Sequence, residues 1–316
     1  MVTSWRSLRR VTLVLGLSML VQSAALPAGA KDAGNYRIYP DNLFGVALGG
    51  QASVVSGYHG ALFVSADGGR AWVQQDSGTD DLLRRVKRLP GGRFVAVSHR
   101  GAIMMSDTAG HGWRVVHTEA GQYLRDVAFA DDQVGWAVGH NGLILRTTDG
   151  GNTWTPFGIS DYKGRDLPRL SGVVALDKSH ALAVGEFGVV ASTSDGGATW
   201  KIVTEQVYPT LLDVAVAGSG GYAVGLNGTL LALSMSRAGE WTMKPLPSKT
   251  MQHLLSVALS ADGSKGLIGG NGLLLTLGKS GFEPAMVVPT VPLSYLWVGG
   301  SRSARTVSRW RSARAA

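Results

Sequence analysis

The sequence contains no cysteine, which excludes disulfide bonds, a thiolate nucleophile, cysteine-bound metals and a lipidated N-terminal cysteine. Its seven histidines lack the short, regular spacings of a metal site. The glycine-rich stretches follow strand-like segments and do not open a helix, so they offer no phosphate-binding loop. We therefore expect neither a metal ion nor a cofactor.

A net charge is missing from most of the chain, although the whole sequence carries a formal charge of +8. Residues 1–30 contain three arginines and no acidic residue, and residues 299–316 contain five arginines and no acidic residue. Residues 31–298 are therefore neutral overall. This distribution does not support a uniformly basic domain that binds nucleic acid.

A membrane-spanning hydrophobic run is missing too, because the apolar run at 11–21 is about half of the roughly 20 residues that a transmembrane helix needs. The run follows three arginines and precedes small residues at 28–30, which is the pattern of an export signal. We expect cleavage near Ala30 and a periplasmic or secreted mature protein. Residues 31–298 would form a single domain, and residues 299–316 a basic tail or a degenerate last strand.

A repeat organises the mature chain. One marker is a turn glycine that recurs at spacings of 41, 41, 46, 40 and 44 residues, namely Gly60, Gly101, Gly142, Gly188, Gly228 and Gly272. A valine precedes each glycine by 14 or 15 residues, namely Val46, Val86, Val127, Val173, Val214 and Val257. Each spacing accommodates four short strands separated by turns.

Tight hairpins are predicted inside these units. Asn-Gly dipeptides at 141–142, 227–228 and 271–272 favour the positive φ angles of a tight hairpin, so the second and third strands should pair antiparallel. Four antiparallel strands in every 40 to 46 residues are typical of a propeller blade. We predict an all-β β-propeller with six legible blades and a favoured seventh, whose strands would include segments 287–288 and 295–298.

A second motif follows the third strand of three units and has the Asp-box pattern Ser/Thr-x-Asp-Gly-Gly-x-x-Trp. Its aspartates and tryptophans are Asp67, Trp72, Asp149, Trp154, Asp195 and Trp200. The aspartate can accept backbone N–H groups across the turn, the glycines allow positive φ angles, and the tryptophan can cover the hairpin base. We interpret the motif as structural, rather than as a calcium or sugar site.

The two motifs together resemble the photosystem II stability and assembly factor family, including its relatives in non-photosynthetic bacteria. The resemblance is carried by Gly135–Gly142 and Thr147–Trp154 and extends over roughly residues 40–280. It implies an exported, non-catalytic, seven-bladed propeller that acts as a protein-binding scaffold or assembly factor. The implied partner is a membrane protein complex, a photosystem or a transporter. We expect the protein to be a monomer.

A sialidase-like glycoside hydrolase, or a carbohydrate-binding propeller, is the alternative, because Asp boxes also occur in sialidases. Such an enzyme binds its acidic sugar with arginines and uses a Tyr/Glu pair. Arg37 lies in a Tyr-Arg-Ile-Tyr-Pro segment that is similar to the sialidase arginine motif but has a tyrosine inserted, and Glu205 with Tyr208 is a candidate pair. The whole sequence has only five glutamates, so carboxylate candidates are few.

Partner-binding residues are expected on the face that carries the hairpins between second and third strands, because loops on a rigid scaffold tend to hold binding residues. The hairpin residues are Tyr58, His59, His99, Arg100, His140, Glu186 and Phe187. The longest connection between blades, 157–168, adds Tyr162, Lys163 and Arg165 as a possible contact loop. A solvated insertion is the alternative for this connection.

The innermost strand of the second unit is charged where the other units are apolar. Lys87 stands where they have alanine or valine, and Arg88 stands where they have leucine, phenylalanine, alanine or valine. Unpaired charge in a core is costly, so these side chains must reach the channel, a face or a carboxylate such as Asp80, Asp81 or Asp126. The family resemblance implies an arginine-rich partner patch, and Arg84, Arg85 and Arg88 are its nearest equivalents. An internal ion-pair network or an irregular blade are the alternatives.

Overall fold

The computed structural model describes residues 43–50, 52–203, 206–278 and 280–285. These residues form 24 β-strands and three one-turn 3-10 helices, so the predicted all-β class is confirmed. None of the helices in this part of the chain has the length and hydropathy that crossing a bilayer requires. The expected leader, the C-terminal tail and the segments expected to build a seventh blade lie outside the described residues.

The strands form six antiparallel sheets of four strands, and each sheet is one blade. Blades 1 and 2 comprise β1 (Leu43–Ala47), β2 (Ser53–Gly57), β3 (Leu62–Ser65), β4 (Val73–Gln75), β5 (Leu83–Arg88), β6 (Phe94–Ser98), β7 (Ala102–Met105) and β8 (Arg114–Thr118). Blades 3 and 4 comprise β9 (Leu124–Phe129), β10 (Gly135–Gly139), β11 (Ile144–Thr147), β12 (Thr155–Phe157), β13 (Leu170–Ala175), β14 (Ala181–Gly185), β15 (Val190–Thr193) and β16 (Lys201–Ile202). Blades 5 and 6 comprise β17 (Leu211–Ala217), β18 (Gly220–Gly225), β19 (Leu230–Met235), β20 (Trp241–Pro245), β21 (Leu254–Leu259), β22 (Gly266–Gly270), β23 (Leu273–Gly278) and β24 (Gly281–Pro284). The helices η2 (Tyr58–Gly60), η3 (Glu186–Gly188) and η4 (Leu226–Gly228) lie in the central hairpins of blades 1, 4 and 5.

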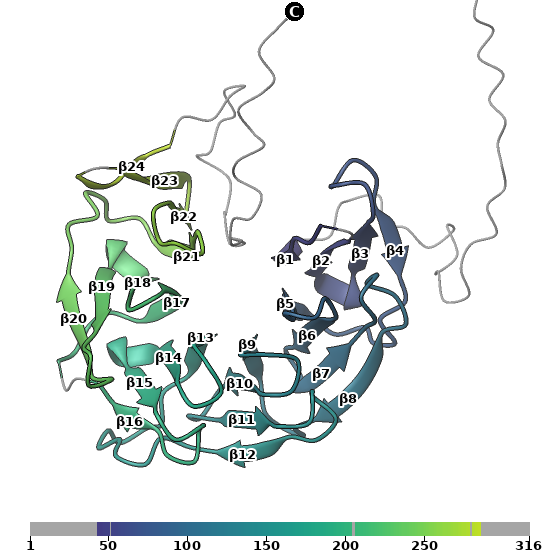
Figure 1. Cartoon of the computed structure of the whole chain (residues 1–316), viewed down its shortest axis with the longest axis horizontal. Coiled ribbons are helices and arrows are strands. Elements are labelled where there is room, and N and C mark those ends of the chain that lie inside the picture. The colour runs from purple at the N-terminus through teal and green to yellow at the C-terminus, as the bar shows by residue number, and fades with distance from the viewer. Residues whose placement is uncertain (1–42, 51, 204–205, 279, 286–316) are drawn as a thin grey trace, which may run out of the picture.

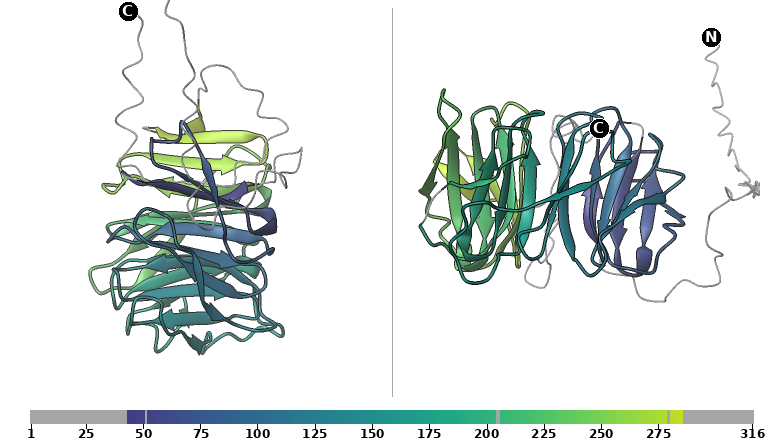
Figure 2. Two further views of the ribbon diagram at one scale, coloured as in Figure 1. Left: turned by 90° about the vertical axis from the view of Figure 1, so that its right-hand side faces the viewer. Right: turned by 90° about the horizontal axis from the view of Figure 1, so that it is seen from below.

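The six blades form an arc around a central channel, with blades 1 and 6 at its ends (Figure 1). The first strand of each blade lines the centre, and consecutive first strands contact one another. Seen from the side, the strands run between two faces of a disc (Figure 2). We call the face with the blade connections and the second-to-third-strand hairpins the hairpin face, and the opposite one the turn face. The predicted propeller of four-stranded blades is confirmed, with six blades in the described residues.

Close backbone packing requires glycine at the start of the central hairpins. A Cβ atom added to Gly139, Gly185 or Gly225 would lie 2.0, 2.2 or 2.1 Å from the carbonyl oxygen of the residue that precedes the blade's first strand. In blades 3 and 4 those residues are Tyr123 and Arg169. The same carbonyls accept the backbone N–H of the next hairpin residue at 2.9 Å. The packing therefore fixes Tyr123 and Arg169 at the hairpin face.

The core lies between neighbouring blades, and an aromatic residue on each fourth strand or just before it reaches back to the preceding blade. Trp200 of blade 4 packs with Val134 and Trp136 of blade 3. The equivalent residues of blades 2, 3 and 5 do the same, namely Trp113, Trp154 and Trp241. Trp72 of blade 1 has no preceding blade among the described residues and is 38% exposed, whereas Trp200 is fully buried. Burial of this tryptophan therefore depends on a neighbouring blade.

Candidate functional site

The first strands place two arginines at the mouth of the channel on the hairpin face. Each first strand begins with a leucine, and a register shift then leaves the second residue outside the ladder. Such a bulge redirects the side chain. The second residues are Phe44, Arg84, Arg125, Ser171, Leu212 and Leu255. Among the six described blades, charge at this position is therefore restricted to blades 2 and 3.

Arg84 and Arg125 are half-buried, and neither has an ion-pair partner among the described residues. Burial lowers the pKa of Arg84, and the charge of Arg85 lowers it further. Burial, followed by the charges of Arg84, Arg169 and Arg85, lowers the pKa of Arg125 to about 10. Both guanidinium groups are charged at neutral pH and repel one another. An anion bound between them would relieve that repulsion.

Three aromatic rings on neighbouring hairpins stand beside these arginines. His99 stacks on Tyr123 with ring centroids 4.4 Å apart, and His140 meets Tyr123 edge-on at 4.8 Å. Burial and then the charges of nearby arginines lower the pKa of both histidines, to about 4 for His140, so both rings are neutral at pH 7. His99 Nδ1 and His140 Nε2 are buried without a hydrogen-bond partner in the described part of the chain. The group therefore adds unused polar atoms to the two cations.

A third arginine at this face is already paired. The Arg169 guanidinium donates through Nε and Nη2 to Glu186 Oε1, with an Nε distance of 2.6 Å, and its backbone N–H donates to Glu186 Oε2 at 2.9 Å. These bonds hold the pKa of Glu186 below its usual range. Because this pair is neutral as a unit, the net positive charge of the site comes from Arg84 and Arg125.

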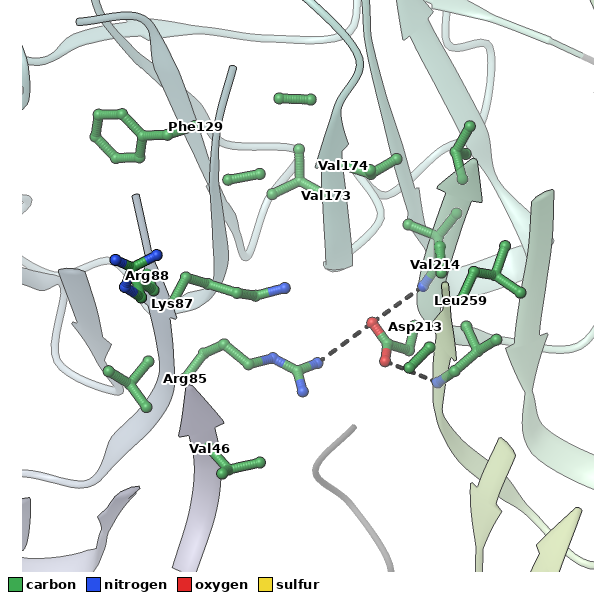
Figure 3. A pocket seen from close by; sticks show the side chains of 17 residues that line it. Val46, Arg85, Lys87, Arg88, Phe129, Val173, Val174, Asp213, Val214 and Leu259 are labelled. Atoms are coloured by element: carbon green, nitrogen blue, oxygen red, sulfur yellow. Dashed lines mark hydrogen bonds and ion pairs between the residues drawn. The ribbon is translucent and has the colours of Figure 1, made fainter. Parts of the chain in front are cut away.

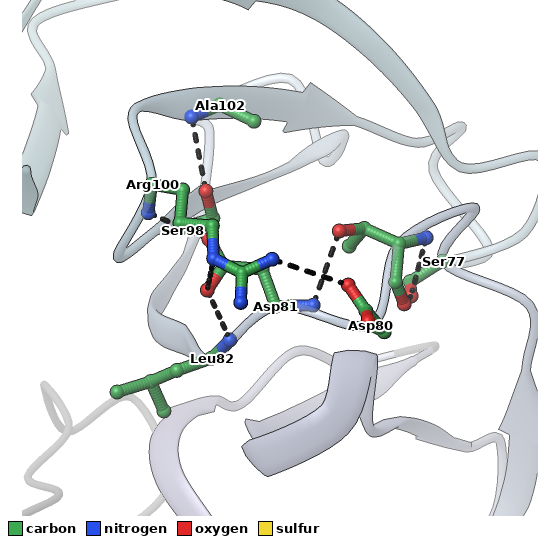
Figure 4. Close-up of polar contacts among 8 residues, drawn as sticks. Ser77, Asp80, Asp81, Leu82, Ser98, Arg100 and Ala102 are labelled. Atoms are coloured by element: carbon green, nitrogen blue, oxygen red, sulfur yellow. Dashed lines mark hydrogen bonds and ion pairs between the residues drawn. The ribbon is translucent and has the colours of Figure 1, made fainter. Parts of the chain in front are cut away.

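Arg100 lies on the same face, in the central hairpin of blade 2, and is anchored through its backbone (Figure 4). Its backbone N–H donates to Oδ2 of the buried Asp81 at 2.6 Å. Its guanidinium lies 3.5 Å from Asp80 Oδ1 and 3.9 Å from Asp81 Oδ1. The side chain is nevertheless 71% exposed, so it can contact a partner at the surface.

Other predicted hairpin residues form an apolar rim. Tyr58 packs edge-on against Phe44 with centroids 5.0 Å apart and is 39% exposed, and Phe187 is 51% exposed. His59 and Phe187 occupy the hairpin position that Asn141 fills in blade 3, with φ angles between 53° and 58°. Such left-handed backbone is uncommon for residues other than glycine and asparagine, so the hairpin geometry overrides residue preference here.

The longest connection between blades is attached to blade 4. Ser160 and Asp161 hydrogen-bond to the backbone at the start of blade 4's fourth strand, at 2.9 to 3.1 Å. Tyr162 packs against the core between blades 3 and 4. Lys163 and Arg165 are exposed. The loop therefore gives Tyr162 a core contact, and contact of Lys163 and Arg165 with a partner stays a prediction.

Arg85 points into the channel and joins an ion-pair network there (Figure 3). Its Nε lies 3.3 Å from Asp126 Oδ1, and its Nη2 lies 3.5 Å from Asp213 Oδ1. Lys87 Nζ lies 3.5 Å from Asp126 Oδ1. Each carboxylate also accepts a backbone N–H of the next blade at 3.0 Å. The internal network considered for blade 2 is therefore present, and it ties blade 2 to blades 3 and 5.

The four basic residues of β5 are divided among three places. Arg84 lies at the hairpin face, Arg85 and Lys87 lie in the channel, and Arg88 is exposed at the turn-face end of β5. Since they do not share one surface, a single partner surface can involve only some of them. Contact of any of them with a partner stays a prediction.

Sequence reasoning missed the residues that complete both clusters. These are Tyr123, Arg125 and Arg169 at the hairpin face, and Asp213 in the channel, whereas Asp126 was among the carboxylates expected to pair with the basic strand. Arg125 could have been predicted from the sequence, because an alignment of the first strands on their leading leucine puts Arg84 and Arg125 at the same position. The aspartates follow one position later, at the place that Arg85 fills in blade 2.

The Asp-Gly-Gly turns lie on the turn face, where their aspartates bind their own loops. Asp149 Oδ1 accepts hydrogen bonds from the Thr153 backbone N–H at 2.9 Å and the Thr147 hydroxyl at 2.8 Å, and Oδ2 accepts the Thr153 hydroxyl at 2.6 Å. Asp195 repeats these contacts, and Asp67 accepts two backbone N–H groups at 2.9 and 3.0 Å. These bonds satisfy the carboxylates within the turn, as a structural role requires.

The Asp149 turn should be sensitive to acid. Hydrogen bonds from Thr153 lower the pKa of Asp149 from 3.8 to about 2, so its stabilisation is present above pH 4 and is lost as the pH falls through 2. We expect Asp149→Asn to lower the free energy of unfolding at pH 7 by under about 1 kcal/mol, because the carboxylate is only partly buried and water screens its interactions. The difference from the wild type should shrink between pH 4 and pH 2 in urea titrations.

A matched control for this prediction is Asp166→Asn, which removes an exposed carboxylate that lies 3.5 Å from the exposed Arg165. It changes the net charge equally without touching an Asp-Gly-Gly turn. If Asp149→Asn differed from the wild type by a constant amount from pH 7 to pH 2, the hydrogen-bonded carboxylate would not be the source of its effect.

Of the three residues proposed for a glycosidase, the structure describes Tyr208. Arg37 and Glu205 lie outside the described residues. Tyr208 is partly buried against the core between blades 4 and 5. In residues 43–285, excluding the gaps at 51, 204–205 and 279, no cluster of three or more His, Asp or Glu side chains is placed to hold a metal ion.

A family model described as photosynthesis system II assembly factor YCF48 matches residues 105–207. The match includes blades 3 and 4 with two of the Asp-Gly-Gly turns, and it ends before blade 5. A search of curated proteins finds no significant match. The predicted resemblance to the photosystem II assembly factor family is confirmed by this match over residues 105–207.

Two solved structures carry the same name. "YCF48 bound to D1 peptide" aligns with a TM-score of 0.58 at 15% identity, covering 80% of this chain and 84% of that one. "YCF48 from Cyanidioschyzon merolae" aligns at 0.59 and 13% identity, covering 76% and 83%. The propeller in "Structure of U3-55K" aligns at 0.66 with only 8% identity, covering 84% and 85%. The structure with the lowest sequence identity has the highest TM-score of the three, so these alignments show a similar fold and nothing more.

Proposed function

We propose that the protein is a non-catalytic binding scaffold whose hairpin face holds an acidic segment of a membrane-protein partner. The observation that carries the proposal is the pair of half-buried arginines at the channel mouth, Arg84 and Arg125, neither of which forms an ion pair within the described residues. Partly desolvated guanidinium groups bind carboxylates through short, charge-assisted and often bidentate hydrogen bonds.

The surroundings of the two arginines suit an extended protein segment. Tyr123 is 42% exposed, and Tyr58 and Phe187 add apolar surface to the same face. Tyrosine and arginine are the residues that most often dominate binding energy at protein interfaces. Since the hairpins are fixed by backbone hydrogen bonds to the first strands, little ordering is required when a partner binds.

The comparisons support a protein partner. One of the similar solved propellers is a YCF48 in complex with a D1 peptide, so a propeller of this kind binds a peptide. By analogy we propose an assembly-factor role at a membrane complex for this chain, either a photosystem or a transporter. The export signal predicted at residues 1–30 supports action in the periplasm or outside the cell, where the exposed segments of such a complex are accessible.

The test is charge reversal at the two arginines. The double variant Arg84→Glu/Arg125→Glu should reduce partner binding about 100-fold, because two charge-assisted contacts of roughly 1.5 kcal/mol each become repulsive or are lost. A tagged full-length chain would be cross-linked in cells, purified from the envelope, and its captured proteins quantified by mass spectrometry against an untagged strain.

The matched control is Arg114→Glu/Lys244→Glu, which makes the same change in net charge on exposed fourth strands. It should recover the partner as the wild type does. If the folded Arg84→Glu/Arg125→Glu variant recovered the same membrane protein in an equal amount, the hairpin-face arginines would not be part of the interface.

A further inference from the structure

Four large apolar side chains are exposed on the loops of the hairpin face in blades 3 to 6, and we call them the apolar crescent. Leu167 lies in the connection between blades 3 and 4, and Phe187 lies in the central hairpin of blade 4. Val207 and Met251 lie in the next two connections between blades, and each is 78% exposed. These two are the most exposed large apolar side chains in the described part of the chain.

The loops that carry the crescent form one continuous rim. In blades 4, 5 and 6 the first hairpin residue donates its backbone N–H, at 2.9 Å, to the carbonyl oxygen just before the first strand. The donor and acceptor pairs are Glu186 with Arg169, Leu226 with Thr210, and Asn271 with His253. The following connection packs closely too, because a Cβ atom added to Gly188 would overlap Tyr208. Each of these hairpins therefore bonds to the connection before it, and the hairpin of blade 4 also contacts the one after it.

The crescent carries little charge. The described residues of the connections that hold Val207 and Met251, 206–210 and 246–253, contain a single acidic or basic side chain, the exposed Lys249. The charges in the adjoining loops of blades 3 and 4 include two ion pairs, Arg165 with Asp166 and Arg169 with Glu186. The rim of blades 4 to 6 is therefore apolar and weakly basic, in contrast to the arginine site on blades 2 and 3.

The shape of the crescent suits a fluid partner. A side chain that is 78% exposed touches little of its own protein, so Val207 and Met251 protrude from their loops. A rigid protein partner would need a fitted pocket for each protruding side chain. The boundary between headgroups and acyl chains of a bilayer adapts to such side chains and leaves the polar backbone of the loops in the headgroup layer. Protruding apolar side chains on one face therefore favour a lipid surface.

We propose that the apolar crescent inserts into the surface of a lipid bilayer, so that the hairpin face lies toward the membrane. The ammonium group of Lys249, two residues from Met251, would contact lipid phosphates, as long cationic side chains do at this interface. The inference builds on the proposed function, because it places Arg84 and Arg125 beside the membrane from which the partner's acidic segment emerges. A segment only a few residues long would then reach the arginine site.

The first experiment locates the loops relative to the lipid. Since the chain has no cysteine, Met251→Cys or Val207→Cys provides a unique site for a nitrobenzoxadiazole fluorophore. The exported chain, purified from cells, would be mixed with vesicles of equal parts phosphatidylcholine and phosphatidylglycerol. We expect a blue shift and a severalfold rise in emission at both sites, because the fluorophore leaves water. Label at Val115→Cys, exposed on the outer strand β8, should not respond.

The second experiment measures the contribution of the crescent to vesicle binding. Val207→Ser/Met251→Ser should weaken cosedimentation with the same vesicles about tenfold, because two inserted apolar side chains become polar. The matched control is Val73→Ser/Val115→Ser, which changes two exposed apolar residues on fourth strands and should bind as the wild type does. Circular dichroism and thermal unfolding would establish that each variant is folded.

Three results would overturn the proposal. The first is no cosedimentation of the folded wild type. The second is unchanged emission at Met251→Cys while the chain sediments, since another part of the chain would then hold the bilayer. The third is equal vesicle binding by the two double serine variants. If Val207→Ser/Met251→Ser lost only the membrane protein captured from detergent extracts, the crescent would be a protein interface.

Failure of this proposal can be distinguished from failure of the proposed function. The fluorophore response of Arg84→Glu/Arg125→Glu should equal that of the charge-matched Arg114→Glu/Lys244→Glu, because neither pair belongs to the crescent. A normal response without capture of a membrane protein would contradict the proposed function alone. Capture that depends on Arg84 and Arg125, with no response at Met251→Cys, would contradict membrane insertion alone.

Discussion

Replacing Asp213 with alanine should lower the free energy of unfolding by about 3–5 kcal/mol, as measured by urea denaturation at pH 7. The Asp213 side chain is 6% exposed and lies 3.5 Å from Arg85, whose own side chain is 14% exposed. Burial raises the pKa of Asp213, which shows that ionising this carboxyl inside the channel is unfavourable. The large effect therefore comes from leaving Arg85 and the Val257 N–H without this partner, not from a strong net attraction.

A second variant separates these contributions. Adding Arg85→Met to Asp213→Ala should recover part of the lost stability, because the unmatched buried cation is then gone. The exposed pair supplies the control, since Asp166→Ala removes a carboxylate 3.5 Å from an exposed arginine and should change stability by less than about 1 kcal/mol. A loss for Asp213→Ala as small as that of Asp166→Ala would mean that the channel network contributes nothing specific.

The motif tryptophans should differ sharply in their contribution to stability. Trp200→Ala should cost about 3–5 kcal/mol, because Trp200 is fully buried between blades 3 and 4. Trp72→Ala removes the same side chain from the same motif position, but Trp72 is 38% exposed, so the loss should be less than half as large. Both values come from urea denaturation followed by circular dichroism, with unchanged far-ultraviolet spectra as evidence of the fold.

The comparison is controlled within the repeat itself. Both tryptophans follow an Asp-Gly-Gly turn, and the two variants delete identical atoms. Equal losses would show that the tryptophan stabilises its own hairpin rather than the interface between blades. A larger loss for Trp72 than for Trp200 would contradict the role of the preceding blade altogether.

The repeat predicts the blades well because each depends on local patterns. The Asn-Gly hairpins are determined by residues next to one another in the sequence, as the positive φ angles of Asn141 and Asn227 illustrate. The Asp-Gly-Gly turns are equally local, since Asp149 binds residues within four positions of itself. The strands and turns can therefore be predicted from local sequence patterns, without information on how the blades are arranged around the channel.

The two charged clusters could not be predicted in the same way, because they depend on which blades face each other. Arg85 and Asp213 are 128 positions apart and meet only because the first strands surround one channel. Arg84 and Arg85 are neighbours in sequence, yet the bulge after Leu83 sends one to the hairpin face and the other into the channel. The run of basic residues therefore predicted one patch, whereas the strand distributes its side chains among three environments.

The backward orientation of the tryptophans gives the propeller a preferred direction of assembly. Blades 2 to 5 each place a tryptophan against the blade that precedes them in the chain. When the chain folds from its amino end, the surface that receives each of these tryptophans is therefore formed first. Every such interface joins consecutive blades and closes only a short loop of chain. The ion pair between Arg85 and Asp213 is different, because it can form only once the fifth blade has arrived. This ion pair would therefore form late in folding, and it would stabilise only an arrangement in which blades 2 and 5 face each other across the channel.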